Sequence, residues 1–145
     1  MSDHPPERHA ASILTRNAWW IVAAFAVIYG DSYLPCDYAA VLAAFRDSGK
    51  PGLMSVYRNR GLWDTSNVEF AGGRILAYDK ANRSPAMQHI DYGLGVFQRT
   101  AFEGVPDDRP SDLAALYQDL LRRGQLAAWE SPGRFYEIEI GRAHV

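Results

Sequence analysis

The sequence predicts one α/β domain with a mixed, mostly parallel sheet and a β-hairpin. Three observations favour this class. Apolar strand-like segments alternate with two helical patterns, and glycines or acids stand at the breaks between them. The 145 residues are 48% apolar and 22% charged, which is ordinary for a globular protein and enough for one hydrophobic core.

The N-terminal third predicts an arm followed by a buried strand. Residues 1–17 are polar and contain Pro5-Pro6, so we expect a loose arm. The uncharged run 18–29 predicts a central first strand over about residues 21–29. A signal peptide is the alternative for this run, which is too short to cross a bilayer as a helix and stops abruptly at Gly30-Asp31.

Two helices and a hairpin follow. Asp37 is a typical N-cap for a helix with apolar residues at 41, 42 and 45, and Gly49 predicts its end. Ser111 or Asp112 begins a second helix, which Gly124 closes. Gly72-Gly73 lies between two strand-like segments and predicts a hairpin. Beyond the first strand, we expect strands at 53–58, 68–70, 75–78, 94–97 and 134–138.

Charge and composition narrow the classes of partner. A net charge of −2 gives no basis for a nucleic-acid surface or for binding an anionic membrane. Cys36 is the only cysteine, which excludes an intrachain disulfide and suits a reducing cytoplasm. The four histidines show no metal-ligand spacing, and we expect His89 to be an interior residue. We expect Trp63 to be a core or packing residue and not a stacking platform.

The first candidate site follows the first strand. A strand that ends at Gly30-Asp31 presents a carboxylate at the edge where open α/β sheets bind ligands. Asp31 is a suitable ligand for a hard cation such as Mg²⁺. The alternative is a turn whose acid caps a helix.

Five motifs then occur in a fixed order: YGDSYLPCD at 29–37, SNVEF at 66–70, YDK at 78–80, IDYGLGVF at 90–97 and RFYEI at 134–138. Together they resemble the sugar-phosphate nucleotidyltransferase family. They are most similar to its mannose-1-phosphate and heptose-1-phosphate guanylyltransferases. The resemblance covers roughly residues 25–138, and it implies part of a Rossmann-like nucleotidyltransferase domain.

The resemblance implies transfer of a nucleotidyl group from a nucleoside triphosphate to a sugar 1-phosphate, with release of pyrophosphate. It implies that Asp31 binds catalytic Mg²⁺ and that Glu137 completes the metal site, although relatives commonly have Asp there. It implies that Lys80 binds the sugar phosphate as a catalytic cation. Exposed turn or strand-end charges are the alternatives for Lys80 and Glu137.

The same resemblance places four residues around the sugar. Asn67 stands near the position that contacts the sugar ring in relatives, and the Asp91-Tyr92-Gly93 segment resembles the one that lines the sugar pocket. Gly93 would permit a close approach of the backbone. Tyr92 has an equally good alternative as a core aromatic residue.

Both ends depart from the family. Relatives begin with a strand and a Gly-rich loop that holds the triphosphate, whereas the only glycine before residue 49 here is Gly30. Residues 1–24 therefore form an atypical arm and the start of the first strand. Residues 139–145 resemble a translated sequencing adapter and are expected to be non-native. We expect a fragment that is inactive alone and that self-associates through an uncovered sheet.

Two other functions stay open at this point. One is a binding module that keeps the sugar-phosphate pocket without turnover. The other is an exported binding protein, which depends only on the apolar run before Gly30.

Overall fold

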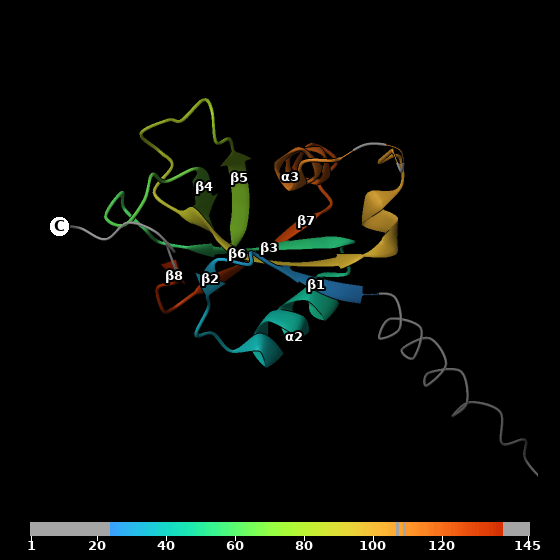
Figure 1. Ribbon diagram of the computed structural model, residues 1–145, viewed down its shortest axis with the longest axis horizontal. Coiled ribbons are helices and arrows are strands. Elements are labelled where there is room, and N and C mark those ends of the chain that lie inside the picture. The colour runs from blue at the N-terminus through green and yellow to red at the C-terminus, as the bar shows by residue number, and fades with distance from the viewer. Residues whose placement is uncertain (1–23, 107, 109, 138–145) are drawn as a thin grey trace, which may run out of the picture.

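A four-stranded sheet lies at the centre of the computed structural model, which describes residues 24–106, 108 and 110–137 (Figure 1). The strand order is β1-β6-β3-β7. Its strands are β1 (Ala24–Ile28), β6 (Ile90–Gln98), β3 (Gly52–Tyr57) and β7 (Leu126–Ser131). The predicted α/β class and mixed sheet are confirmed.

The balance of strand directions differs from the expectation of a mostly parallel sheet. Strand β6 runs antiparallel to both β1 and β3, and only β3 and β7 are parallel. The reason is the route of the chain between β3 and β6. The chain leaves the sheet at the end of β3 and re-enters it beside that same end, where Ile90 pairs with Tyr57. Strand β6 must therefore run back in the opposite direction.

The predicted central position of the first strand is wrong. Strand β1 lies at the edge of the sheet and pairs with β6 alone among the described residues. The side chains of Phe25 and Ile28 are 46% and 47% exposed, because no further layer covers them in the part of the chain that is described. The expected arm at 1–17 and the expected tail at 139–145 lie outside the described residues.

Helix α2 (Tyr38–Ser48) covers one face of the sheet, below it in Figure 1. Asp37 caps this helix as predicted, since its Oδ1 accepts a hydrogen bond of 3.0 Å from the amide of Ala40. Gly49 ends it with a φ of 64°. Val41 and Phe45 of the helix are buried in one hydrophobic core with residues of β3 and β6.

Helix α3 (Leu113–Arg122) and the hairpin of β4 (Val68–Ala71) and β5 (Arg74–Tyr78) cover the other face (Figure 1). Asp112 caps the helix through the amide of Ala114 at 2.9 Å. The predicted hairpin turn is confirmed, with a positive φ at both Gly72 and Gly73. A second core forms on this side and includes Met54, Phe97, Tyr117 and Leu120.

Three strands differ clearly from what the sequence predicts. Strand β6 has nine residues where we expected only 94–97, because its polar and glycine positions hide the strand pattern. Strand β7 was not predicted, since its alanines disfavour a strand until pairing with β3 stabilises one. The predicted last strand begins later than expected, as β8 (Tyr136–Glu137), which pairs with β2 (Ser32–Tyr33); residue 138 lies outside the described residues. Neither helix of the described chain has the length and hydrophobicity needed to cross a bilayer.

Candidate functional site

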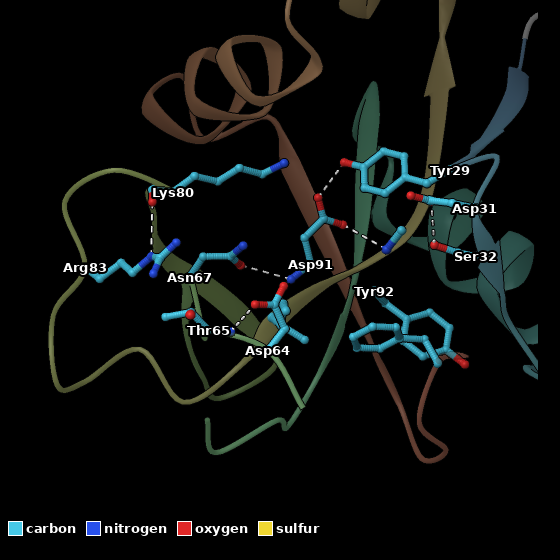
Figure 2. Close-up of a pocket in the computed structure, with 13 residues that line it drawn as sticks. Tyr29, Asp31, Ser32, Asp64, Thr65, Asn67, Lys80, Arg83, Asp91 and Tyr92 are labelled. Carbon is cyan, nitrogen blue, oxygen red and sulfur yellow. Dashed lines mark hydrogen bonds between the residues drawn. The ribbon is translucent and has the colours of Figure 1, made fainter. Parts of the chain in front are cut away.

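A pocket of about 230 Å³ lies where the end of β1 and the start of β6 meet the loops that precede β4 and follow β5 (Figure 2). Six residues predicted as site residues line it together: Asp31, Asn67, Lys80, Asp91, Tyr92 and Gly93. They come from four motifs spread over about half of the chain. The seventh predicted residue, Glu137, pairs through its backbone with Ser32, next to Asp31.

Asp91 is the most buried acid of the site, with 8% of its surface exposed. Its Oδ2 accepts a hydrogen bond from the phenol of Tyr29 at 2.7 Å and lies 3.5 Å from that of Tyr78. Its Oδ1 accepts one from the amide of Gly93 at 3.0 Å. Burial raises the pKa of Asp91, while these hydrogen bonds and the charge of Lys80 act in the opposite direction.

Asn67 holds the strand end beside this acid. Its Oδ1 accepts a hydrogen bond of 3.1 Å from the amide of Asp91, which leaves its amide nitrogen available to a ligand. The backbone of Asn67 is fixed in turn, because its amide donates to the carbonyl of His89 and its carbonyl accepts from Asp79.

Gly93 is required by its own backbone and by a neighbour. Its φ is +88°, a conformation that residues with a Cβ rarely adopt. A Cβ there would lie 3.2 Å from Cδ2 of the Tyr29 ring. Burial and the adjacent Asp91 carboxylate raise the pKa of the Tyr29 phenol, so Tyr29 stays protonated and donates to Asp91 at neutral pH.

Lys80 reaches into the pocket from the turn after β5. Its Nζ lies 5.7 Å from the centre of the Tyr29 ring, and Figure 2 shows its side chain extended toward Tyr29 and Asp91. Asp79 stabilises the turn, because its Oδ1 accepts from the amides of Ala81 and Asn82 at 2.8 and 2.9 Å. The ammonium group thus extends from a well-defined turn.

Asp31 is an exposed carboxylate at the rim of the pocket, with one contact of 3.3 Å from the hydroxyl of Ser32. Its oxygens suit Mg²⁺, which is typically held by one or two carboxylates together with phosphate oxygens and water. No group of three acid, histidine or cysteine side chains suited to a metal occurs among the described residues. The donor set fits a metal shared with a phosphorylated ligand better than a site made by protein alone.

Tyr92 is mainly a core aromatic residue, which was the alternative to a role in the sugar pocket. It is 1% exposed and packs edge-on against Phe135, with ring centres 6.1 Å apart. His89 is also interior, as expected, and its Nε2 lies 3.1 Å from Oε1 of Glu130. Trp63 is not a core residue, although it does pack against another side chain. It is 54% exposed, and the guanidinium of Arg134 stacks 3.7 Å from its ring centre.

Several lining residues were not predicted as site residues: Tyr29, Ser32, Asp64, Thr65, Arg83, Ile90 and Phe135. Tyr29 and Ser32 flank Asp31 in the same motif, so that motif already contained a signal. Asp64, Thr65 and Arg83 stand in loops of ordinary polar composition. They line the same pocket as Asp91 only because of how the hairpin packs on the sheet, and a local sequence pattern carries no information about that packing.

Comparison with known proteins identifies solved structures of similar architecture. No protein-family model and no curated protein sequence matches the chain. A solved structure from Bacillus anthracis, assigned as a glucose-1-phosphate thymidylyltransferase and bound to sucrose, has a TM-score of 0.65 at 13% identity. The inositol-1-phosphate CTP transferase from T. maritima has a TM-score of 0.63 at 17% identity.

These alignments cover 93% and 92% of this chain but only 57% and 56% of the two solved chains. The protein therefore spans little more than half the length of those enzymes. At such low identity the likeness concerns architecture alone. Together with the mixed sheet, it shows that the chain has the fold of part of a nucleotidyltransferase domain.

Proposed function

We propose that this chain forms the sugar-phosphate side of a sugar-1-phosphate nucleotidyltransferase active site. The observation that carries the proposal is the meeting of Lys80, Asn67 and Asp91 in one pocket with Asp31 at its rim. A cation, an amide and a buried acid around a polar cavity suit a ligand with one phosphate and several hydroxyl groups. The nucleotidyltransferase fold supports the same reaction class.

In the proposed reaction, a phosphate oxygen of the sugar 1-phosphate forms a bond to the α-phosphorus of the nucleoside triphosphate. The bond between the α-phosphorus and the bridging oxygen breaks, and pyrophosphate leaves with that electron pair. Such transfers depend on positioning and on neutralising charge. Lys80 binds the attacking phosphate, and Arg83 adds a second cation at the same wall.

The sugar is held by the remaining lining groups. Asn67 donates from its amide nitrogen, and Asp91 accepts from ring hydroxyls while Tyr29 keeps its carboxylate in place. Gly93 allows the sugar to approach the backbone, and Tyr92 forms part of the wall. The proposed acceptor is a mannose 1-phosphate or a heptose 1-phosphate, with a guanine nucleotide as donor, in the cytoplasm.

Asp31 and Glu137 are the proposed Mg²⁺ ligands. Bound Mg²⁺ would neutralise charge on the phosphates as the new bond forms. The backbone supports this pairing of roles, because β2 and β8 pair directly at Ser32 and Glu137 and so bring the Glu137 segment next to Asp31.

A chimaera tests the proposal. The glycine-rich front end of a nucleotidyltransferase joined to this chain should release pyrophosphate when given sugar 1-phosphate and nucleoside triphosphate, whereas the chain alone should not. Asp31→Asn should abolish the release, because it removes the metal-binding charge at nearly constant shape. Lys80→Ala should chiefly raise KM for the sugar 1-phosphate. Near-normal turnover of Asp31→Asn at saturating Mg²⁺ would overturn the metal assignment.

The second candidate is a sugar-phosphate-binding module without turnover. Its basis is the same pocket, where Lys80, Asn67 and Asp91 can bind a sugar phosphate whether or not a reaction follows. The chimaera separates the two candidates. Saturable binding of sugar 1-phosphate with no pyrophosphate release from any folded chimaera would support the module and contradict the enzyme.

A further inference from the structure

A second pocket, of about 470 Å³, lies at the carboxyl ends of the parallel strands β3 and β7. Its lining residues are Tyr57, Arg58, Arg60, Leu62, Glu130, Ser131 and Pro132. Tyr57 and Ser131 are paired at the end of the two strands. Carboxyl ends of parallel strands are a frequent place for ligands, and the volume is in the range of small-molecule sites.

Two arginines give this pocket its charge. Arg58 and Arg60 are both exposed, and within the described residues neither guanidinium forms a hydrogen bond or an ion pair. Each guanidinium therefore keeps its full set of donors for a ligand. Guanidinium groups match the oxygens of phosphate in a two-point geometry.

The residue between the arginines holds them in place. Asn59 is fully buried, and its Nδ2 donates to the carbonyl of Asp64 and, at 3.3 Å, to the hydroxyl of Ser66. Its Oδ1 accepts from the amide of Trp63 at 3.2 Å. Arg60 has a φ of 51° and is the only described residue other than glycine with a positive φ. A bulky residue held in this region stores strain of the kind found at ligand sites.

The rest of the pocket favours a dianion with a flat or apolar body. Leu62, Tyr57 and Pro132 supply apolar surface beside the arginines, and Leu62 is 71% exposed. Glu130 contributes one negative charge, and its Oε1 already contacts His89 at 3.1 Å. Two guanidinium groups and one carboxylate leave a net positive charge, which attracts a doubly charged phosphate more strongly than a singly charged carboxylate.

The loop from Arg58 to Ser66 separates this pocket from the first one. Arg58, Arg60 and Leu62 line the second pocket, whereas Asp64 and Thr65 of the same loop line the first. The two pockets share no lining residue. The second pocket is therefore a distinct site at the same edge of the sheet.

We propose that Arg58 and Arg60 form a second binding site, which takes the phosphate monoester of a small molecule with a ring or apolar body. This site goes beyond the proposed nucleotidyl transfer and does not depend on it. The phosphate lies between the two guanidinium groups, and the body of the ligand rests on Leu62 and Tyr57.

Phenyl phosphate is a suitable probe, because it combines a phosphate monoester with a flat ring. Titrated into ¹⁵N-labelled full chain at about neutral pH, it should shift the amides of Arg58, Arg60 and Ser131 in a saturable manner. Inorganic phosphate should bind more weakly, since it lacks the ring. Benzoate, which has the ring and a single charge, should bind more weakly as well.

Two double variants of equal charge test the assignment. Arg58→Gln with Arg60→Gly should weaken phenyl phosphate binding by roughly tenfold or more, and glycine suits the positive φ at residue 60, so folding is preserved. Arg74→Gln with Arg99→Gln removes two exposed arginines elsewhere and should leave binding unchanged.

Three results would overturn the proposal. The first is the absence of saturable shifts up to about 10 mM phenyl phosphate. The second is a set of shifts centred on Asn67 and Gly93, which would place the probe in the first pocket. The third is equal weakening by the two double variants, which would show that only net charge matters.

Discussion

The phenol of Tyr29 donates a hydrogen bond of 2.7 Å to the buried carboxylate of Asp91, across 62 residues of sequence. It joins the end of β1 to the start of β6, where the amide of Tyr29 also donates to the carbonyl of Gly93. The bond places a protonated tyrosine against an acid that burial disfavours in its charged form. Both residues line the first pocket, so the ionisation of Asp91 affects both stability and binding.

The first prediction concerns how stability depends on pH. Burial raises the pKa of Asp91 in the folded chain above its ordinary value of 3.8, so folding favours the protonated acid. That stability is fully present below the ordinary pKa and is lost as the pH rises through the folded pKa. In urea unfolding from about pH 3.5 to about pH 7.5, wild type should therefore lose stability relative to Asp91→Asn as the pH rises.

Asp79 provides a control of opposite sign. Hydrogen bonds from the backbone of Asn82 and Ala81 lower its pKa, so its contribution is present above 3.8 and is lost as the pH falls. The free energy of unfolding of wild type minus that of Asp79→Asn should therefore increase as the pH rises.

The same difference for Asp91→Asn should decrease as the pH rises. A difference that stays constant or increases would contradict the burial of an ionisable Asp91.

A second prediction concerns the packing of α3 on the sheet. A Cβ at Gly95 would lie 2.2 Å from the hydroxyl oxygen of Tyr117 and 2.7 Å from the Phe97 ring. Gly95→Ala should lower the free energy of unfolding by about 1–3 kcal/mol, as overpacked cores do. Adding Tyr117→Phe should restore part of this loss, because it removes the atom in closest conflict.

Gly133→Ala is the matched control for this change, since the nearest atom to its Cβ would be 3.8 Å away. Its midpoint in a urea titration should equal that of the wild type. An unchanged midpoint for Gly95→Ala would show that α3 does not pack on β6 through Tyr117.

A third prediction concerns association of the chain with itself. Strand β1 lies at the edge of the sheet, and Phe25 and Ile28 on it are about half exposed. Such an edge is a template for pairing with another strand. Sedimentation velocity should detect concentration-dependent dimers or larger species, and Ile28→Lys should reduce them by placing a charge on the edge.

Leu42→Lys is the comparison for Ile28→Lys, because Leu42 is also about half exposed but lies on α2. It should have a smaller effect on association. If the wild type sediments as a monomer at every concentration, self-association through the exposed edge of β1 would be contradicted.

The local elements were predictable because their signals are local. Asp37 and Asp112 cap the two helices through amides two or three residues away, and Gly72-Gly73 turns the hairpin within its own backbone. The edge position of β1 and the existence of β7 were not predictable in this way. Both depend on which strand pairs with which, and that is decided by packing across the whole sheet.

The same division applies to the site. Asp31, Lys80 and Asp91 belong to separate motifs: Asp31 was expected at a strand end, Lys80 after a strand, and Asp91 in the segment that lines the sugar pocket. Their common pocket was an inference from resemblance, since no spacing in the sequence brings them together. The bond from Tyr29 to Asp91 and the support that Asn59 gives its loop are long-range or buried contacts, which only the folded chain reveals.

Binding of a sugar 1-phosphate to the first pocket tests the proposed site directly. Mannose 1-phosphate titrated into the ¹⁵N-labelled chain should shift the amides of Asn67, Lys80 and Gly93 in a saturable manner, and free mannose should not. Lys80→Gln should weaken binding roughly tenfold, because it removes the phosphate contact. Lys50→Gln changes the only other lysine, whose Nζ donates to the carbonyl of Leu126, and should bind as wild type does. Equal affinities of the two lysine variants, or no saturable shift in the wild type, would contradict a sugar-phosphate site at Lys80.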